Sequence, residues 1–159
     1  MQSSSFNPME NLRVEHQVIA DLLALMKEEQ QHLIAANAEA VAQVTEQKTK
    51  LIAKASDLAK ARHAALAQAG FADREESMQA WLASVNQGSI TQAWEELLAI
   101  TRSAKEMNRL NGMLINKQLS NTQNALQALH TPAHGTAQNF YGPNGQATAA
   151  PTSRRLVVG

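Results

Sequence analysis

Apolar residues recur at intervals of three and four positions along most of this chain, and no segment alternates strictly between apolar and polar residues. Intervals of three and four place side chains on one face of an α-helix, whereas alternation is typical of a half-buried strand. The pattern predicts helices near residues 9–36, 38–69, 74–85 and 89–131. We therefore expect an all-α fold, in which an antiparallel helical hairpin packs with a short helix and one long C-terminal helix as a coiled-coil-like bundle.

Residues that favour helix ends support the limits of the first three helices. Asn37 is a favoured N-cap residue and separates the first two helices. Gly70 suits the position after a helix, and Phe71 is the apolar residue that usually follows it. Asp73 and Glu76 match a capping box and predict the start of the short helix.

The last helix should begin at Ser89 and end before Pro132, because the residue before a proline disfavours the α region. Its length is about 40 residues, or about 60 Å. Residues 131–159 are rich in proline, glycine and small polar residues, which indicates a mobile tail. We expect a frayed lead-in at residues 1–8, a helical bundle domain at residues 9–130 and this flexible tail.

The register of the hairpin follows from the pattern of charged and apolar residues. Facing residues of an antiparallel helix pair have numbers that add up to a constant, and a sum of 77 places Glu15 opposite Arg62 and Glu29 opposite Lys48. The same sum pairs Leu12 with Ala65, Ile19 with Leu58, Leu22 with Ala55, Met26 with Leu51 and Leu33 with Val44. Such seam charges mainly set register and orientation.

The composition indicates a helical protein without a strong electrostatic partner. The formal net charge is zero, so binding to nucleic acid or directly to anionic lipid has no electrostatic driving force. There is no cysteine, which excludes a disulfide framework and a thiolate zinc site. No segment resembles a signal peptide or is apolar enough to span a bilayer, so we expect a cytoplasmic protein.

Catalytic and metal-binding patterns are incomplete. Glu29-x-x-His32 matches half of a carboxylate-bridged di-metal site, which needs this element twice and two further inward acids. The chain has no phosphate-binding glycine loop and no convincing set of nucleophile and base. We therefore expect no enzymatic activity, no metal and no cofactor.

The stretch from Asn108 to Gln118 places two asparagines and a glycine on the apolar side of the long helix. Gly112 is the one glycine inside a predicted helix. It costs about 1 kcal/mol relative to alanine, but it leaves room for a neighbouring backbone. Asn108 and Asn111 lie on the apolar seam. They either fix the register inside the bundle, as a buried asparagine does in coiled coils, or contact a partner.

Apolar residues around this stretch cover more than one face of the helix. A helix with so wide an apolar surface is buried among several neighbours or keeps one face for a partner. Apolar residues in the tail have no core to serve, which also favours partner contact. With Asn108, Asn111 and Gly112, the candidate partner-binding residues are Leu110, Met113, Leu114, Leu119, Leu126, Phe140, Tyr141, Leu156, Val157 and Val158.

Two motifs follow the predicted hairpin, N-x-x-N-G-x-L-I at Asn108, Asn111, Gly112, Leu114 and Ile115, and Y-G-x-x-G at Tyr141, Gly142 and Gly145. In this order they resemble the FlgN family of flagellar type III export chaperones, over nearly the whole chain. The resemblance implies binding to the hook-associated proteins that join hook and filament, and delivery of these proteins to the membrane export gate. It also implies that the C-terminal region binds the cargo. Such chaperones are often acidic, whereas this chain is neutral.

Two other functions stay open for this pattern. A general cytoplasmic helical adaptor or regulatory protein-binding module would share the bundle but need no secreted partner. A bundle that binds a small molecule would need a concave polar cluster, and the sequence indicates none. Copurification of a flagellar protein would distinguish the chaperone from the general adaptor.

Overall fold

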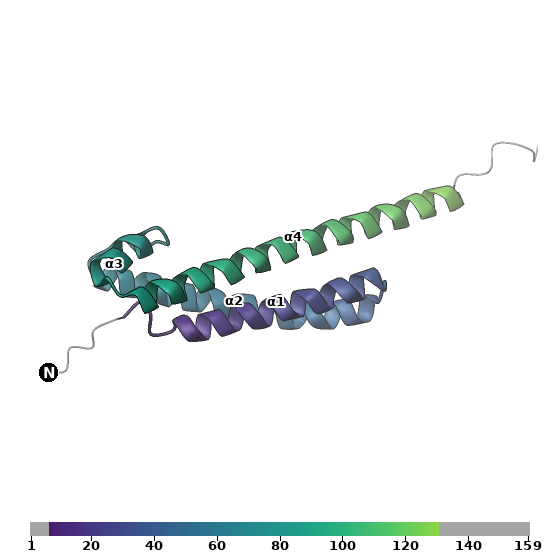
Figure 1. Ribbon diagram of the computed structural model, residues 1–159. Coiled ribbons are helices and arrows are strands. Elements are labelled where there is room, and N and C mark those ends of the chain that lie inside the picture. The colour runs from purple at the N-terminus through teal and green to yellow at the C-terminus, as the bar shows by residue number, and fades with distance from the viewer. Residues whose placement is uncertain (1–6, 131–159) are drawn as a thin grey trace, which may run out of the picture. The chain divides into compact units, whose positions relative to one another are not determined.

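The computed structural model describes residues 7–130, which contain four α-helices and no strand (Figure 1). The helices are α1 (Leu12–Ile34), α2 (Ala38–Gln68), α3 (Ser77–Val85) and α4 (Gly88–His130). The predicted all-α class is confirmed. The chain divides into two units, residues 1–118 and 119–159, which are described separately. The predicted domain limits stay predictions, because residues 1–6 and 131–159 lie outside the described part.

Helices α1 and α2 form an antiparallel hairpin, and Figure 1 shows them side by side. Ala36 ends the first helical segment in a left-handed conformation, with φ of 53°. The side chain of Asn37 then accepts a hydrogen bond from the backbone N–H of Ala40 at 3.1 Å, as the N-cap of α2. The predicted break at Asn37 is confirmed. Helix α1 is shorter than predicted because turns form at both of its ends.

The C-terminal end of α2 is closed by a glycine. Gly70 has φ of 88°, a conformation in which a Cβ is unfavourable. The backbone N–H of Phe71 donates to the carbonyl of Leu66 at 3.0 Å, the long-range hydrogen bond of a Schellman-type cap. The Phe71 side chain packs against the main core. The predicted helix end and its apolar contact are therefore both confirmed.

The start of α3 differs from the prediction. Glu76 occupies the N-cap position, and its side chain forms no capping hydrogen bond. The neighbouring Glu75 instead contacts Arg62 and His63 of α2. The predicted capping box of Asp73 and Glu76 is wrong, because these residues belong to a turn that is held to α2 rather than to the first turn of the helix.

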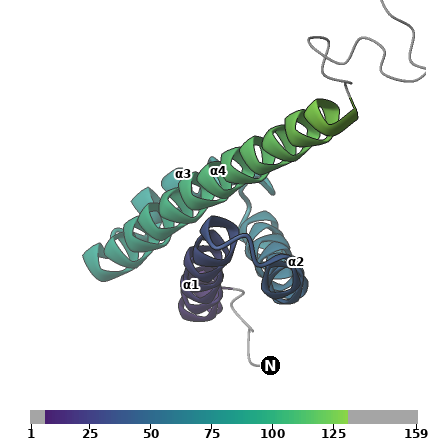
Figure 2. The same ribbon diagram turned by 90° about the vertical axis from the view of Figure 1, so that its right-hand side faces the viewer.

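The main core lies where α1, α2, α3 and the first turns of α4 meet. Its buried residues are Leu12, Leu66, Met78, Trp81, Leu82, Trp94 and Leu97. A second cluster of Leu22, Met26 and Ala104 has Leu51 packed against it, as the sum of 77 predicts for Met26 and Leu51. Figure 2 shows α1 and α2 next to each other, with α4 on one side of the pair. The first unit is thus a three-helix bundle with α3 added at one end.

The second unit contains the last turns of α4. Residues 119–130 are helical, and every one of their side chains is exposed. None of the helices within residues 7–130 combines the length and the apolar character that a membrane crossing requires.

Candidate functional site: a polar-anchored bundle and an apolar groove

A buried arginine joins α1, α2 and α4. The Nε and Nη2 atoms of Arg62 each donate to a carboxylate oxygen of Glu15 at 3.0 Å, a bidentate pair. Both side chains are buried. The guanidinium also lies 4.7 Å from the ring centroid of Trp94 on α4. Because Arg62 contacts an acid on one helix and an aromatic ring on another, it fixes the register of three helices at this level.

The same arginine holds the turn before α3. Its Nη1 donates to Oε2 of Glu75 at 2.9 Å, and Nε2 of His63 lies 2.8 Å from that oxygen. Burial acts to raise the pKa of Glu75, but the hydrogen bonds from His63 and Arg62 outweigh it and lower the pKa below the ordinary carboxyl value. Burial is the largest single effect on the pKa of Arg62 and acts to lower it. The hydrogen bonds and charges of Glu15 and Glu75 together exceed this effect, so the pKa of Arg62 is raised.

A second polar layer lies two heptads along the hairpin. Lys48 Nζ donates to the two carboxylate oxygens of Glu29 at 2.8 and 3.0 Å. The amide Nδ2 of Asn111 donates to Glu29 at 2.8 Å and to the carbonyl of Met26 at 2.7 Å. The predicted pairs of Glu29 with Lys48 and of Glu15 with Arg62 are therefore both confirmed.

The two asparagines predicted on the apolar seam, Asn108 and Asn111, have different environments. Asn111 is 1% exposed and binds α1 through its amide, so its side chain anchors α4 to the hairpin. Asn108 is exposed, and its Oδ1 lies 3.5 Å from Lys48 Nζ, a long contact. Further along α4, the amide of Gln118 donates to the carbonyl of Leu33. Asn111 and Gln118 thus hold α4 to α1. For Asn111 this corresponds to the first alternative, an asparagine that fixes the register inside the bundle.

No neighbouring segment within residues 7–130 packs closely against Gly112. A Cβ built at this position meets no side chain and no other segment within 4 Å. The expected close approach of a backbone is therefore absent from the described part of the bundle. The opening at Gly112 leaves space for a larger residue or for a partner.

Glu29 and His32 do not form half of a metal site. Both oxygens of Glu29 are engaged by Lys48 and Asn111, while the His32 ring contacts Glu28 at 3.4 Å. Within residues 7–130, no group of three or more His, Asp or Glu residues is arranged to hold a metal ion.

An apolar groove lies between the C-terminal end of α1 and the middle of α4, and we call it the α1–α4 groove. It has a volume of about 480 Å³. Its lining consists of Gln30, Ile34, Leu110, Met113, Leu114 and Lys117. Ile34 is 65% exposed and Met113 is 56% exposed, which is unusual for two large apolar residues beside each other. The structure thus brings three of the predicted partner-binding residues into one groove.

The sequence-based prediction missed the α1 side of this groove. Ile34 is the last residue of α1 and lies outside its apolar seam, so the periodicity of α1 did not predict a contact for it. A large apolar residue outside the seam was the one feature of the sequence that could have indicated this side of the groove. The other predicted positions lie elsewhere: Leu119 and Leu126 are 55% and 51% exposed in the second unit, and Phe140, Tyr141, Leu156, Val157 and Val158 lie outside the described residues.

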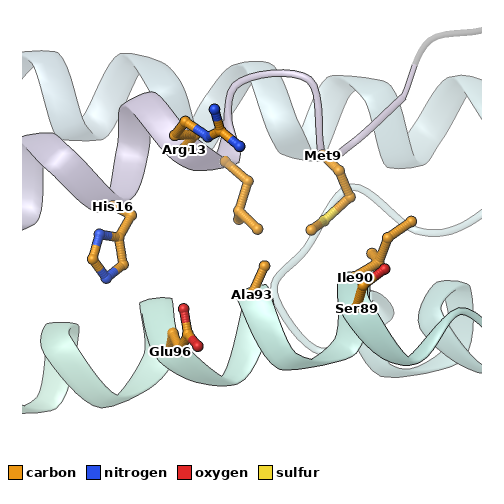
Figure 3. A pocket seen from close by; sticks show the side chains of 8 residues that line it. Met9, Arg13, His16, Ser89, Ile90, Ala93 and Glu96 are labelled. Carbon is orange, nitrogen blue, oxygen red and sulfur yellow. The ribbon is translucent and has the colours of Figure 1, made fainter.

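A second groove lies between the first turns of α1 and α4 (Figure 3). Figure 3 shows His16 of α1 and Glu96 of α4 pointing toward one another across it. Arg13 and Met9 also line it. Charges of both signs border this groove, so it indicates no particular ligand.

The fold and the exposed apolar surface define a class: an all-helical bundle with an exposed apolar groove. Comparison with known proteins then identifies the family. The profile of the FlgN family, described as FlgN protein, matches residues 1–149. The chain belongs to the FlgN family. This confirms the resemblance and supports a role in the flagellum.

Curated relatives carry the same family name. A "Flagella synthesis protein FlgN" of Escherichia coli is 32% identical over 133 residues, which cover 82% of this chain and 83% of the relative. A protein of the same name from Yersinia enterocolitica is 25% identical over 149 residues, with 92% and 93% covered. No solved structure matches the chain significantly.

Proposed function

We propose that this protein is a cytoplasmic flagellar export chaperone that binds hook-associated proteins before secretion and delivers them to the type III export gate. Membership of the FlgN family supports the flagellar role. The observation that carries the binding role is the α1–α4 groove, in which Ile34 and Met113 stay exposed beside the half-buried Leu110 and Leu114. No catalytic step is part of this proposal.

The groove suits an amphipathic helix. Leu110, Met113 and Leu114 come from one helix, and Ile34 provides the opposite wall, so a third helix can place apolar residues between them. The unassembled ends of a hook-associated protein would expose such an apolar stripe. Covering it needs no nucleotide, because burial of apolar area contributes about 25 cal/mol per Å² before the costs of binding.

The test is copurification of hook-associated proteins with the full chain and with substituted chains. Met113→Asp and Leu114→Asp should lose the cargo, because each puts a charge where the apolar side chains of the cargo would pack. Ile52→Asp is the matched control, since Ile52 is 49% exposed on α2 and does not line the groove. Circular dichroism must show unchanged helicity in all three variants.

The predicted tail contacts are tested in the same experiment. A chain that ends at Thr131 lacks Phe140, Tyr141 and the Leu156–Val158 run, which we propose contact a partner such as the export gate. If substitution in the groove leaves cargo capture intact while the shortened chain loses it, the tail and not the groove binds the cargo.

A further inference from the structure

Charge is distributed unevenly along the chain although the net charge is zero. All fourteen Asp and Glu residues lie at or before Glu106, and residues 107–159 contain no acid. Four of the fourteen Lys and Arg residues follow Glu106, namely Arg109, Lys117, Arg154 and Arg155. Residues 1–106 therefore hold ten bases against fourteen acids, a net charge of −4, and residues 107–159 carry +4.

Lys117 is the charge that this asymmetry places at the α1–α4 groove. The groove lining contains Lys117 and no acid. Among residues 7–130, Lys117 is exposed and forms no ion pair. The acids that precede Gln30 on α1 are already engaged, since Glu28 contacts His32 and the buried Glu29 pairs with Lys48. The lining of the groove is therefore mainly apolar and includes one cation that forms no ion pair within the described residues.

We propose that the α1–α4 groove selects an acidic amphipathic helix of a partner protein, one that carries Glu or Asp beside its apolar stripe, opposite Lys117. This inference rests on the proposed function, because it describes the kind of helix that the chaperone groove accepts. The apolar residues of the groove supply the attraction, and Lys117 supplies the discrimination between acidic and basic helices.

The charge of the groove argues against three other occupants. A second copy of this chain would bring the same cationic surface against itself across a two-fold axis. The chain's own residues 131–159 contain Arg154 and Arg155 and no acid, so they would add charge of the same sign. An anionic membrane is recognised by clusters of roughly 4–8 basic residues, whereas this groove has only Lys117.

The experiment compares three synthetic amphipathic peptides with one leucine stripe and with Glu, Gln or Lys beside that stripe. Binding to the full chain is measured by fluorescence anisotropy. The Glu peptide should bind about 2- to 5-fold more tightly than the Gln peptide, as expected for one solvent-exposed ion pair, and the Lys peptide should bind most weakly. Higher salt should reduce the difference between peptides.

Substitution of the lysine tests the assignment. Lys117→Glu should reverse the order of the three peptides. Lys54→Glu is the matched control, because Lys54 is exposed on α2, does not line the groove and makes the same change in net charge. This control should leave the order of the peptides unchanged.

Four results would overturn the inference, and they differ from a failure of the proposed function. Equal affinity of the three peptides would show that the groove binds helices without a preference for acidic ones.

No binding by any peptide, with cargo still copurifying, would show that the cargo binds elsewhere. Tighter binding by a peptide of residues 151–159 would assign the groove to the chain's own tail, and Lys117-dependent binding of phosphatidylserine vesicles would assign it to lipid. Loss of cargo binding altogether is the separate failure of the proposed function.

Discussion

At the scale of single residues, the bundle depends on a few polar side chains whose partners are also buried. Asn111 donates to Glu29 and to the carbonyl of Met26, so removing its amide leaves two buried acceptors short of a donor. We predict that Asn111→Ala lowers the free energy of unfolding by about 1–3 kcal/mol. Urea denaturation followed by circular dichroism measures this, with Asn108→Ala as the exposed control that should cost about 0.5 kcal/mol or less. Equal effects of the two substitutions would contradict the anchoring role of Asn111.

Arg62 provides a second prediction at this scale. Arg62→Leu leaves the buried carboxylate of Glu15 unpaired, so it should cost about 3–5 kcal/mol. The double variant Glu15→Leu/Arg62→Leu removes both charges together and should recover most of that loss, because well-packed apolar residues often replace a buried pair without cost. Urea denaturation of the two single variants and the double variant gives the coupling energy. A double variant that is less stable than Arg62→Leu would refute this account.

At the scale of helices, one glycine weakens α4 and another is needed to end α2. A Cβ at Gly112 meets no other segment, so Gly112→Ala should stabilise the helix by about 1 kcal/mol. Gly70 has φ of 88°, so Gly70→Ala should destabilise by about 1–2 kcal/mol. Thermal unfolding of the two variants should therefore shift the midpoint in opposite directions. A lower midpoint for Gly112→Ala would mean that a segment does approach this glycine.

The attachment of the turn before α3 should depend on pH. The pKa of Glu75 is lower in the folded protein than its ordinary value of 4.5, so the folded state favours the ionised carboxylate. Its contribution to stability is complete above about pH 4.5 and is lost as the pH falls through the folded pKa. We predict that the natural chain loses more stability below pH 4.5 than Glu75→Gln does. Unfolding in urea at a series of pH values compares the two slopes, and identical slopes would exclude this role of Glu75.

At the scale of the whole molecule, the core and the polar layers all lie within residues 7–118. The side chains of residues 119–130 are all exposed. We predict that a chain ending at Gln118 keeps a cooperative unfolding transition, with a free energy within about 1 kcal/mol of the full chain's value. Denaturant unfolding of the two chains tests this. Loss of cooperativity in the shorter chain would show that the C-terminal unit is required for folding.

Local sequence signals determined the helices and the register of the hairpin. Periodicity, the N-cap residue Asn37 and the terminating Gly70 act over a few residues, so the sequence contains them directly. The pairs of Glu15 with Arg62 and of Glu29 with Lys48 were also predictable. The register of an antiparallel helix pair is defined by a single number, the sum of the facing residue numbers, and the two charge pairs give the same sum. The capping box at Asp73 was mispredicted, because the turn before α3 is held by the contact of Glu75 with Arg62 of α2, a tertiary contact that the local pattern does not contain.

The roles of the polar and apolar positions of α4 depend on how the helices pack against one another. The sequence left Asn111 either inside the bundle or at a partner surface, and its donation to the carbonyl of Met26, 85 residues away, places it inside. The groove likewise needs Ile34 from one helix and Met113 from another, and no periodicity within a single helix can relate the two. The physical reason is that a helical pattern defines which side chains share a face, whereas the rotation and crossing of packed helices determine which faces remain exposed.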